Sequence, residues 1–153
     1  MTYLQSGLPV PVADALDAPF WEGLSAQELR LQRCLSCQKF QWGPEWVCHR
    51  CLEFDLGYEA VTPEGVIYSF ERVWHPVHPA LRDQGPYLIV LVSLPHADNV
   101  RLVGNLLGDP LQPVRIGARV HGVFEHHELA GATGGGEIPT TFTLLQWRLE
   151  MGS

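Results

Sequence analysis

All four cysteines of this 153-residue chain lie in one stretch, CLSCQKFQWGPEWVCHRC. They form two pairs, Cys34/Cys37 and Cys48/Cys51, with two residues inside each pair and ten between the pairs. A tetrahedral four-thiolate site needs two short loops that each present two sulfurs, and the C-x-x-C spacing supplies such loops. The pattern therefore predicts a zinc ribbon in which these four cysteines bind one structural metal ion.

Other uses of the cysteines fit less of this pattern. Disulfides are rare in the reducing cytosol, which leaves metal binding or redox chemistry for two C-x-x-C pairs. We expect zinc, while rubredoxin-type iron would use the same four ligands. His49 could replace a sulfur, but the cysteines already complete the set, so we expect it to be an exposed residue. A closed four-ligand site has no open position for substrate, and we expect its metal to fold the ribbon.

A short helix and a strand are expected before the cysteines. Asp17 is predicted as the N-cap, and Pro19 falls in the first turn, where its missing N–H costs nothing. Residues 29–32 alternate apolar and polar side chains in a short strand that leads to Cys34. The apolar residues that share one side of the helix are Phe20, Trp21 and Leu24.

The segment between the cysteine pairs is unusually apolar. A small ribbon has little core of its own, so we expect these residues to pack against the rest of the chain or to anchor a partner. They are Phe40, Trp42, Pro44, Trp46 and Val47.

Five apolar runs follow the ribbon, and Gly- and Pro-rich turns separate them. They cover residues 66–74, 87–94, 100–107, 119–127 and 141–149. Five strands without a long helix are typical of the OB-fold, a partly open five-stranded barrel. We therefore predict a mainly β protein with a helix and zinc ribbon over residues 13–60 and an OB-fold domain over residues 61–150.

The first and fourth loops of the predicted barrel are its longest. The first holds His75 and His78 among several prolines, and the fourth holds Gly131 and Gly134 to Gly136. Because these two loops usually carry the binding elements of an OB-fold, we expect binding residues there.

Charge and the N-terminal segment restrict the cellular context. The formal net charge is -7 and Lys39 is the only lysine, so the basic surface that holds a phosphate backbone is missing. The first residues show no basic region followed by an apolar one, and no apolar run reaches the roughly 18 residues of a membrane helix. We expect a cytoplasmic protein that binds neither nucleic acid nor membrane.

Several stretches resemble, in order and spacing, the acyl-CoA-associated family with an N-terminal rubredoxin-like zinc ribbon and a C-terminal OB-fold. They lie within residues 17–127 and read PFWEGL, LRLQRCLSCQKFQWGP, GVIYSFERVWHPVHPALRD, PYLIVLVSL, VRLVGNL and VRIGARVHGVFE. The chain departs from the family at Leu52 and Glu53, where a glycine-containing turn is common.

The resemblance implies an accessory subunit of a thiolase-superfamily enzyme. Such a subunit has no catalytic residues of its own, binds a thiolase-fold protein and helps to hold the acyl-CoA substrate. The reaction would be aldol cleavage, thiolysis or acyl transfer, and the preferred setting is aldol cleavage of a steroid or other bulky acyl-CoA. The CoA thioester is then the substrate of the complex.

Eight side chains are candidates for contact with acyl-CoA or the partner. On the predicted first barrel strand, Tyr68, Phe70, Arg72 and Trp74 should share one face because side chains alternate with period two. That face suits CoA binding and ordinary barrel packing equally. The eight candidates are Trp21, Phe40, Trp42, Trp46, Tyr68, Arg72, His75 and His78.

Two other functions remain open at this point. A zinc ribbon with an OB-fold could bind single-stranded nucleic acid through aromatic stacking, although the acidic charge opposes this. A free-standing enzyme could use His75 or His78 as an acid or base, but no nucleophile or carboxylate partner stands beside them in the sequence.

Overall fold

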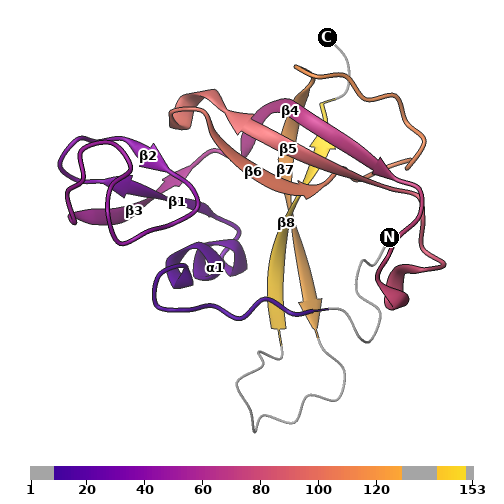
Figure 1. The fold of residues 1–153 in the computed structure, drawn as a ribbon, viewed down its shortest axis with the longest axis horizontal. Helices are drawn as coiled ribbons and strands as arrows, with labels where there is room; N and C mark the ends of the chain where they lie inside the picture. Colours follow the sequence, from indigo (N-terminus) through magenta and orange to yellow (C-terminus); the bar gives the residue numbers. More distant parts are fainter. Residues whose placement is uncertain (1–8, 129–140, 151–153) are drawn as a thin grey trace, which may run out of the picture.

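Two antiparallel sheets and one short α-helix make up the described part of the chain in the computed structural model, which covers residues 9–128 and 141–150 (Figure 1). The predicted glycines of the fourth barrel loop lie outside this part. The mainly β fold class is confirmed. The elements are α1 (Ala18–Ser25), β1 (Leu29–Cys34), β2 (Phe40–Gln41), β3 (Leu56–Val61), β4 (Glu64–Val73), η1 (Pro79–Leu81), β5 (Tyr87–Leu94), η2 (Pro95–Ala97), β6 (Val100–Asn105), β7 (Arg119–Glu128) and β8 (Thr141–Leu149).

Helix α1 begins where the sequence predicts, but its cap differs from the prediction. Asp17 is the N-cap residue, yet its side chain accepts no hydrogen bond from a helical backbone N–H. One carboxylate oxygen accepts from the Asp14 N–H (2.8 Å) and the other from the Trp21 indole N–H (3.0 Å). The carboxylate therefore fixes the incoming chain and the Trp21 ring. Among the described residues, no helix is long and apolar enough to cross a membrane.

The ribbon sheet has the strand order β2-β1-β3, with β1 at its centre. Strand β3 pairs with β1 along six positions, from Leu29 opposite Val61 to Cys34 opposite Leu56. Strand β3 was not predicted, because none of its six side chains is buried and the strand shows no alternating apolar pattern. Pairing with β1 is what makes this segment extended.

The second sheet has the order β6-β5-β4-β7-β8, and it curls until its two edges meet at a seam. The seam is narrow: Leu106 and Trp147 form an isolated parallel bridge, and the Leu107 N–H donates to the Trp147 carbonyl (2.8 Å). Gly104 permits the close approach, since a Cβ there would lie 2.7 Å from the Leu145 carbonyl oxygen. All five predicted strands are present, and the order is that of an OB-fold.

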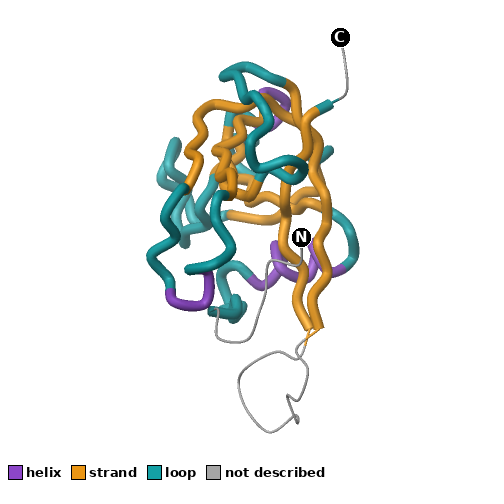
Figure 2. Tube along the Cα trace, turned by 90° about the vertical axis from the view of Figure 1, so that its right-hand side faces the viewer, coloured by secondary structure: helices purple, strands orange, loops and turns teal. Residues whose placement is uncertain are grey.

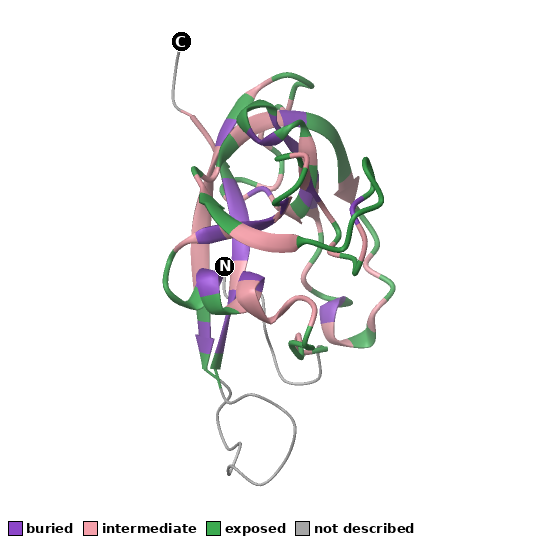
Figure 3. Cartoon of the chain, turned by 90° about the vertical axis from the view of Figure 1, so that its left-hand side faces the viewer, coloured by how far each residue is buried: buried purple, intermediate pink, exposed green. Residues whose placement is uncertain are grey.

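The hydrophobic core joins α1 and the barrel. Helix α1 packs against β1, β7 and β8, and Figure 2 shows it beside the long hairpin that β7 and β8 form. Most buried positions lie on the strands and on α1, while many loop positions are exposed (Figure 3). The largest fully buried side chain is Trp147. The cluster also includes Phe20, Leu24, Leu29, Leu31, Ile67, Leu88, Val90, Val92, Leu94, Leu102 and Val120.

A β-bulge in β4 contradicts the prediction that four alternating side chains share one face. The pairing of β4 with β5 shifts between Ile67 and Ser69, which leaves Tyr68 as the extra residue. Tyr68 lies against the Arg101 guanidinium of β6, 3.6 Å from its ring centroid, on the outside of the barrel. Phe70 instead pairs with the buried Val90. Tyr68 therefore leaves the face that Phe70 and Arg72 occupy.

The ribbon and the barrel are tied together at Asp98, in the turn between β5 and β6. Its two carboxylate oxygens accept from the Lys39 ammonium group (2.9 Å) and from the Phe40 backbone N–H (2.9 Å). The Phe40 N–H, followed by Lys39, lowers the pKa of the Asp98 carboxyl below its ordinary value. The contact thus links residues 58 or more positions apart in the sequence.

Asp98→Asn is expected to lower the free energy of unfolding by about 1 kcal/mol at pH 7, because the bond from Phe40 weakens and the ion pair is lost. A carboxyl group whose pKa is lower in the folded than in the unfolded protein adds stability at pH values above its pKa in the unfolded chain, which is about 4. The difference between the two proteins should therefore stay constant from pH 8 to 5 and shrink below pH 4. Urea unfolding at several pH values measures it.

Zinc content is measured at each pH, because the partners of Asp98 lie in the ribbon and protonation of the cysteines releases the metal. Only pH values at which both proteins keep their zinc enter the difference. A difference that grows as the pH falls would contradict the role given to Asp98.

Candidate functional site: a four-cysteine metal centre and its aromatic loop

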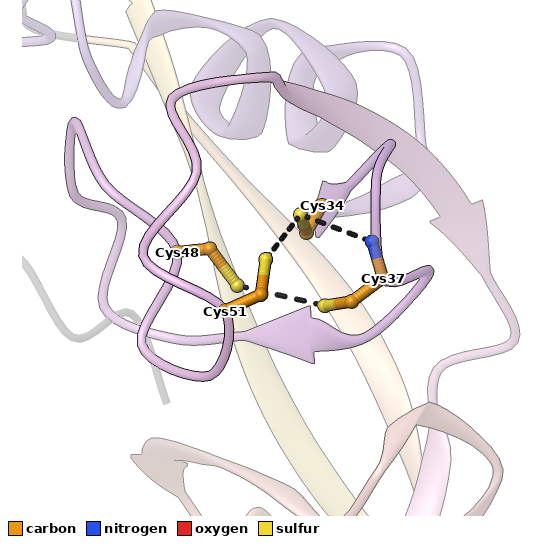
Figure 4. A group of neighbouring side chains, drawn as sticks. All are labelled: Cys34, Cys37, Cys48 and Cys51. Carbon is orange, nitrogen blue, oxygen red and sulfur yellow. Dashed lines mark hydrogen bonds between the residues drawn. The ribbon is translucent and has the colours of Figure 1, made fainter.

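The two cysteine pairs form knuckles of the same design, one after β1 and one after the aromatic segment (Figure 4). In the first, the Gln38 N–H donates to the Cys34 carbonyl (2.9 Å), and in the second the Leu52 N–H donates to the Cys48 carbonyl (3.2 Å). Backbone N–H groups also point at the first sulfur of each knuckle. The local backbone thus turns both sulfurs of each pair toward the other pair.

The four sulfurs have the separation that a tetrahedral ion needs. All four lie within 4.8 Å of one another, and the Cys34–Cys51 and Cys37–Cys48 sulfur distances are both 3.6 Å. Four sulfurs held about 2.3 Å from a zinc ion in a tetrahedron lie about 3.8 Å apart. The residues present therefore fit one structural zinc ion, and zinc supplies folding energy when bound in such a closed site.

Electrostatics within the cluster also favour a bound cation. The backbone N–H groups of Cys51 and Arg50 lower the pKa of Cys48 to about 6. At Cys51 the Glu53 N–H favours the thiolate, but burial and the neighbouring Cys34, Cys48 and Cys37 sulfurs together raise its pKa to about 12. Four thiolates cannot all be charged side by side without a compensating cation, and a divalent metal removes this competition.

Each knuckle ends on a residue with a positive φ, a conformation that favours glycine. Leu52 has φ 64° and Gln38 has φ 63°. Leu52 stands where a glycine-containing turn is common in the family, and it adopts the left-handed conformation itself. The four predicted cysteine ligands are therefore unaffected. The cost falls on the backbone, at about 1–2 kcal/mol for a residue with a Cβ.

Leu52→Gly is expected to raise the free energy of unfolding by about 0.5–1 kcal/mol. Glycine relieves the backbone strain, but its greater conformational entropy in the unfolded chain offsets part of this gain. The Leu52 side chain is 70% exposed, so little packing is lost. Gln38→Gly is the matched comparison and should gain less, because the Gln38 amide also donates to the Leu35 carbonyl (2.6 Å). Thermal unfolding of the zinc-loaded proteins tests this, and equal or opposite changes would contradict it.

A buried pair of glutamines, which was not predicted from the sequence, holds the loop between the knuckles. Gln32 on β1 and Gln41 on β2 are cross-strand neighbours, 3% and 5% exposed, and the Gln41 amide donates to the Gln32 side-chain oxygen (2.6 Å). Gln32 also exchanges hydrogen bonds with the Glu45 backbone, and the Gln41 oxygen accepts from the His49 N–H (2.8 Å). Such amides satisfy loop groups that would otherwise be unpaired. Their signal in the sequence was a polar residue on each strand beside the cysteines.

The aromatic residues of this loop divide into two groups. The Trp42 ring lies 4.4 Å from the Phe20 ring of α1, and Phe40 packs against the core beneath the Arg33 guanidinium. Both therefore join the ribbon to the rest of the chain. Trp46, by contrast, is 65% exposed at the end of the loop. The roles predicted for these residues in ligand or partner contact stay predictions.

Of the other five predicted contact residues, Trp21 lines the same cleft as Trp42, and the remaining four lie elsewhere. Trp21 is half-buried and joins α1 to Asp17 through its indole N–H. The Arg72 guanidinium donates to the Pro110 and Gln112 carbonyls (2.8 and 2.7 Å), so it fixes the loop after β6. His78 accepts from the Ala80 N–H (3.2 Å) and caps η1.

His75 is exposed in the loop after β4. Tyr68 lies outside the barrel, 47% exposed beneath Arg101. His49, which could have replaced a sulfur, is exposed, and the only group of metal-ligating side chains found among the described residues consists of the four cysteines.

Comparisons with known proteins match this architecture domain by domain. Residues 21–57 match a family model described as the rubredoxin-like zinc ribbon domain of ChsH2, and residues 58–125 match its C-terminal OB-fold domain. A chain of the solved Ltp2-ChsH2(DUF35) aldolase is 28% identical, with a TM-score of 0.69 over 91% of this chain and 98% of that one.

Two further relatives are more distant or differ in length. A Sulfolobus solfataricus protein of unknown function from the DUF35 family shares the fold, with a TM-score of 0.53, 18% identity, and coverage of 69% of this chain and 75% of that one. A Thermomonospora curvata protein named "Probable enoyl-CoA hydratase alpha subunit" is 32% identical over 73% of this chain. The chain spans about a third (34%) of the length of that relative.

Proposed function

The chain belongs to the family that combines the ChsH2-type zinc ribbon with the ChsH2-type OB-fold, and on that basis we propose that it is a non-catalytic accessory subunit in acyl-CoA metabolism. It binds a thiolase-fold enzyme and helps to hold the acyl-CoA substrate of the complex. The reaction that we propose is carbon–carbon bond cleavage of a bulky acyl-CoA, such as a steroid derivative, by a retro-aldol step.

The observation that carries this proposal is the likeness to a chain of the Ltp2-ChsH2(DUF35) aldolase, which extends over both domains. The described residues support a role without catalysis. The metal site is closed by four cysteines, Arg72 is engaged by backbone carbonyls, and His78 caps a helix. Each of these side chains has a structural task.

The ribbon offers a contact surface for the partner. Trp46 is held at the end of the inter-knuckle loop by the buried Gln32–Gln41 pair, and it is 65% exposed. The two knuckles also expose large apolar side chains, namely Leu35 and Leu52. An exposed tryptophan on a loop held in place by buried hydrogen bonds is a common interface anchor.

Co-purification of the tagged chain from its native host, with mass spectrometry of the recovered proteins, tests the proposal. We expect a thiolase-fold protein in stoichiometric amount. The recombinant complex should cleave a carbon–carbon bond of an acyl-CoA, and the isolated chain should not.

The matched variant is Trp46→Ala, which should weaken the complex at least tenfold while the chain remains folded. Recovery of a clean monomer, or a partner whose activity is the same with and without the chain, would overturn the proposal. Turnover by the isolated chain would favour the free-standing enzyme instead.

A further inference from the structure

A groove follows the seam of the barrel, where β6 approaches β8 without a regular ladder. One cleft of about 440 Å³ is lined along β6 by residues 102–105 and along β8 by residues 144–146. A second, of about 430 Å³, continues along the same strands, with residues 105–108 and Arg148 in its wall. Asn105 lines both clefts. The two clefts therefore adjoin at Asn105, and we treat them as the two halves of one groove.

The first half of this groove is apolar. Helix α1 contributes Phe20, Trp21 and Leu24, the ribbon contributes Trp42, and β6 contributes Val103, which is 66% exposed. No charged side chain lines this half among the residues that the structure describes. Apolar walls from three different elements favour a hydrocarbon group.

The second half carries charge above an apolar floor. Glu125 of β7 and Arg148 of β8 line it together with Asn105, over Leu88 and Leu106. Buried His127, 6% exposed, donates through Nε2 to one Glu125 oxygen (2.6 Å) and stacks on Phe142, so the carboxylate is fixed in place. A fixed acceptor and a guanidinium donor suit an uncharged chain that carries both N–H and C=O groups.

We propose that this seam groove binds the acyl-pantetheine portion of an acyl-CoA, with the hydrocarbon in the apolar half and the amide-bearing arm beside Glu125 and Arg148. The proposal rests on the proposed function for its substrate class. The groove is lined in part by β5 and β6, the second and third barrel strands, which form the usual OB-fold binding face. His127 acts as a positioning residue for Glu125.

Calorimetric titration of the purified chain with CoA and with butanoyl-, octanoyl- and dodecanoyl-CoA, below their micelle concentrations, tests this. Affinity should rise about two- to fourfold per added methylene until the apolar half is full. Val103→Trp should weaken long-chain esters at least tenfold and flatten the length dependence. Ile116→Trp is the control, since Ile116 is 70% exposed and lies outside the groove.

Arg148→Met keeps the side-chain stem and removes the charge, and it should lower the affinity for every ester by a similar factor, about tenfold. Affinity that does not depend on acyl length, or equal binding by the Val103→Trp and Ile116→Trp variants, would overturn the groove. Binding of the thiolase-fold partner is measured separately. A chain that binds the partner without length-dependent acyl-CoA binding refutes only the groove, and the reverse result refutes only the proposed complex.

Discussion

Cys48→Ser is expected to abolish metal binding and to unfold the ribbon. Cys48 is 1% exposed, its N–H donates to the Glu53 carbonyl (2.8 Å), and its sulfur lies 3.6 Å from that of Cys37. A serine hydroxyl at this position is neither a thiolate nor long enough to complete the tetrahedron. Zinc contributes about 10–16 kcal/mol in small four-ligand domains, so loss of the ion removes far more than any single contact.

The measurements are metal content per chain and the far-ultraviolet circular dichroism of the freshly purified protein. We expect about one zinc ion in the native protein, less than half an equivalent in the variant, and loss of the ribbon's strand signal. His49→Ala is the control: His49 lies inside the same knuckle, its backbone N–H donates to Gln41, and its side chain has no hydrogen-bond partner within residues 9–128 and 141–150. A variant that keeps one ion and melts as the native protein does would show that Cys48 is no ligand.

Trp147→Ala is expected to give the second largest effect, a loss of about 3 kcal/mol in the free energy of unfolding. Trp147 is 0% exposed and fills the barrel beside Gly104 at the seam. Its truncation leaves a large cavity, for which about 3–5 kcal/mol is typical. The indole N–H has no hydrogen-bond partner among the described atoms. Removal of this unpaired buried donor offsets part of the lost stability, so we expect a loss at the lower end of that range.

Trp46→Ala supplies the matched control for this prediction. The same substitution at a side chain that is 65% exposed should change the free energy of unfolding by about 0.5 kcal/mol or less. Denaturant unfolding of both variants in their zinc-loaded forms makes the comparison. Similar losses for the two would mean that Trp147 is not at the centre of the core.

The parts of the fold that local sequence determines were predicted well. The strands β5 and β8 were predicted with their observed bounds, because their apolar side chains alternate or run together between clear turns. The knuckles were predicted because the C-x-x-C spacing is a local property, and each knuckle closes with a turn hydrogen bond across five residues, Gln38 to Cys34 and Leu52 to Cys48. The start of α1 followed from Asp17 and Pro19.

Other features depend on segments that are distant in the sequence. Strand β3 has no buried side chain and is extended only because β1 lies beside it. The bulge at Tyr68 shifts a pattern that period two alone would carry through the strand. The hydrogen bonds from Arg72 to the carbonyls of Pro110 and Gln112, 38 and 40 residues away, also had no signal in the local sequence.

The sequence alone determined that four cysteines form one metal site and that a five-stranded barrel follows, since spacing and alternation are local properties that survive in any packing. Only the tertiary structure decided how the aromatic residues between the cysteines are used. Trp42 packs on Phe20, whereas Trp46 remains exposed. The seam groove with Glu125 and Arg148 likewise exists only because β6 closes on β8, and no local pattern specifies which strands meet.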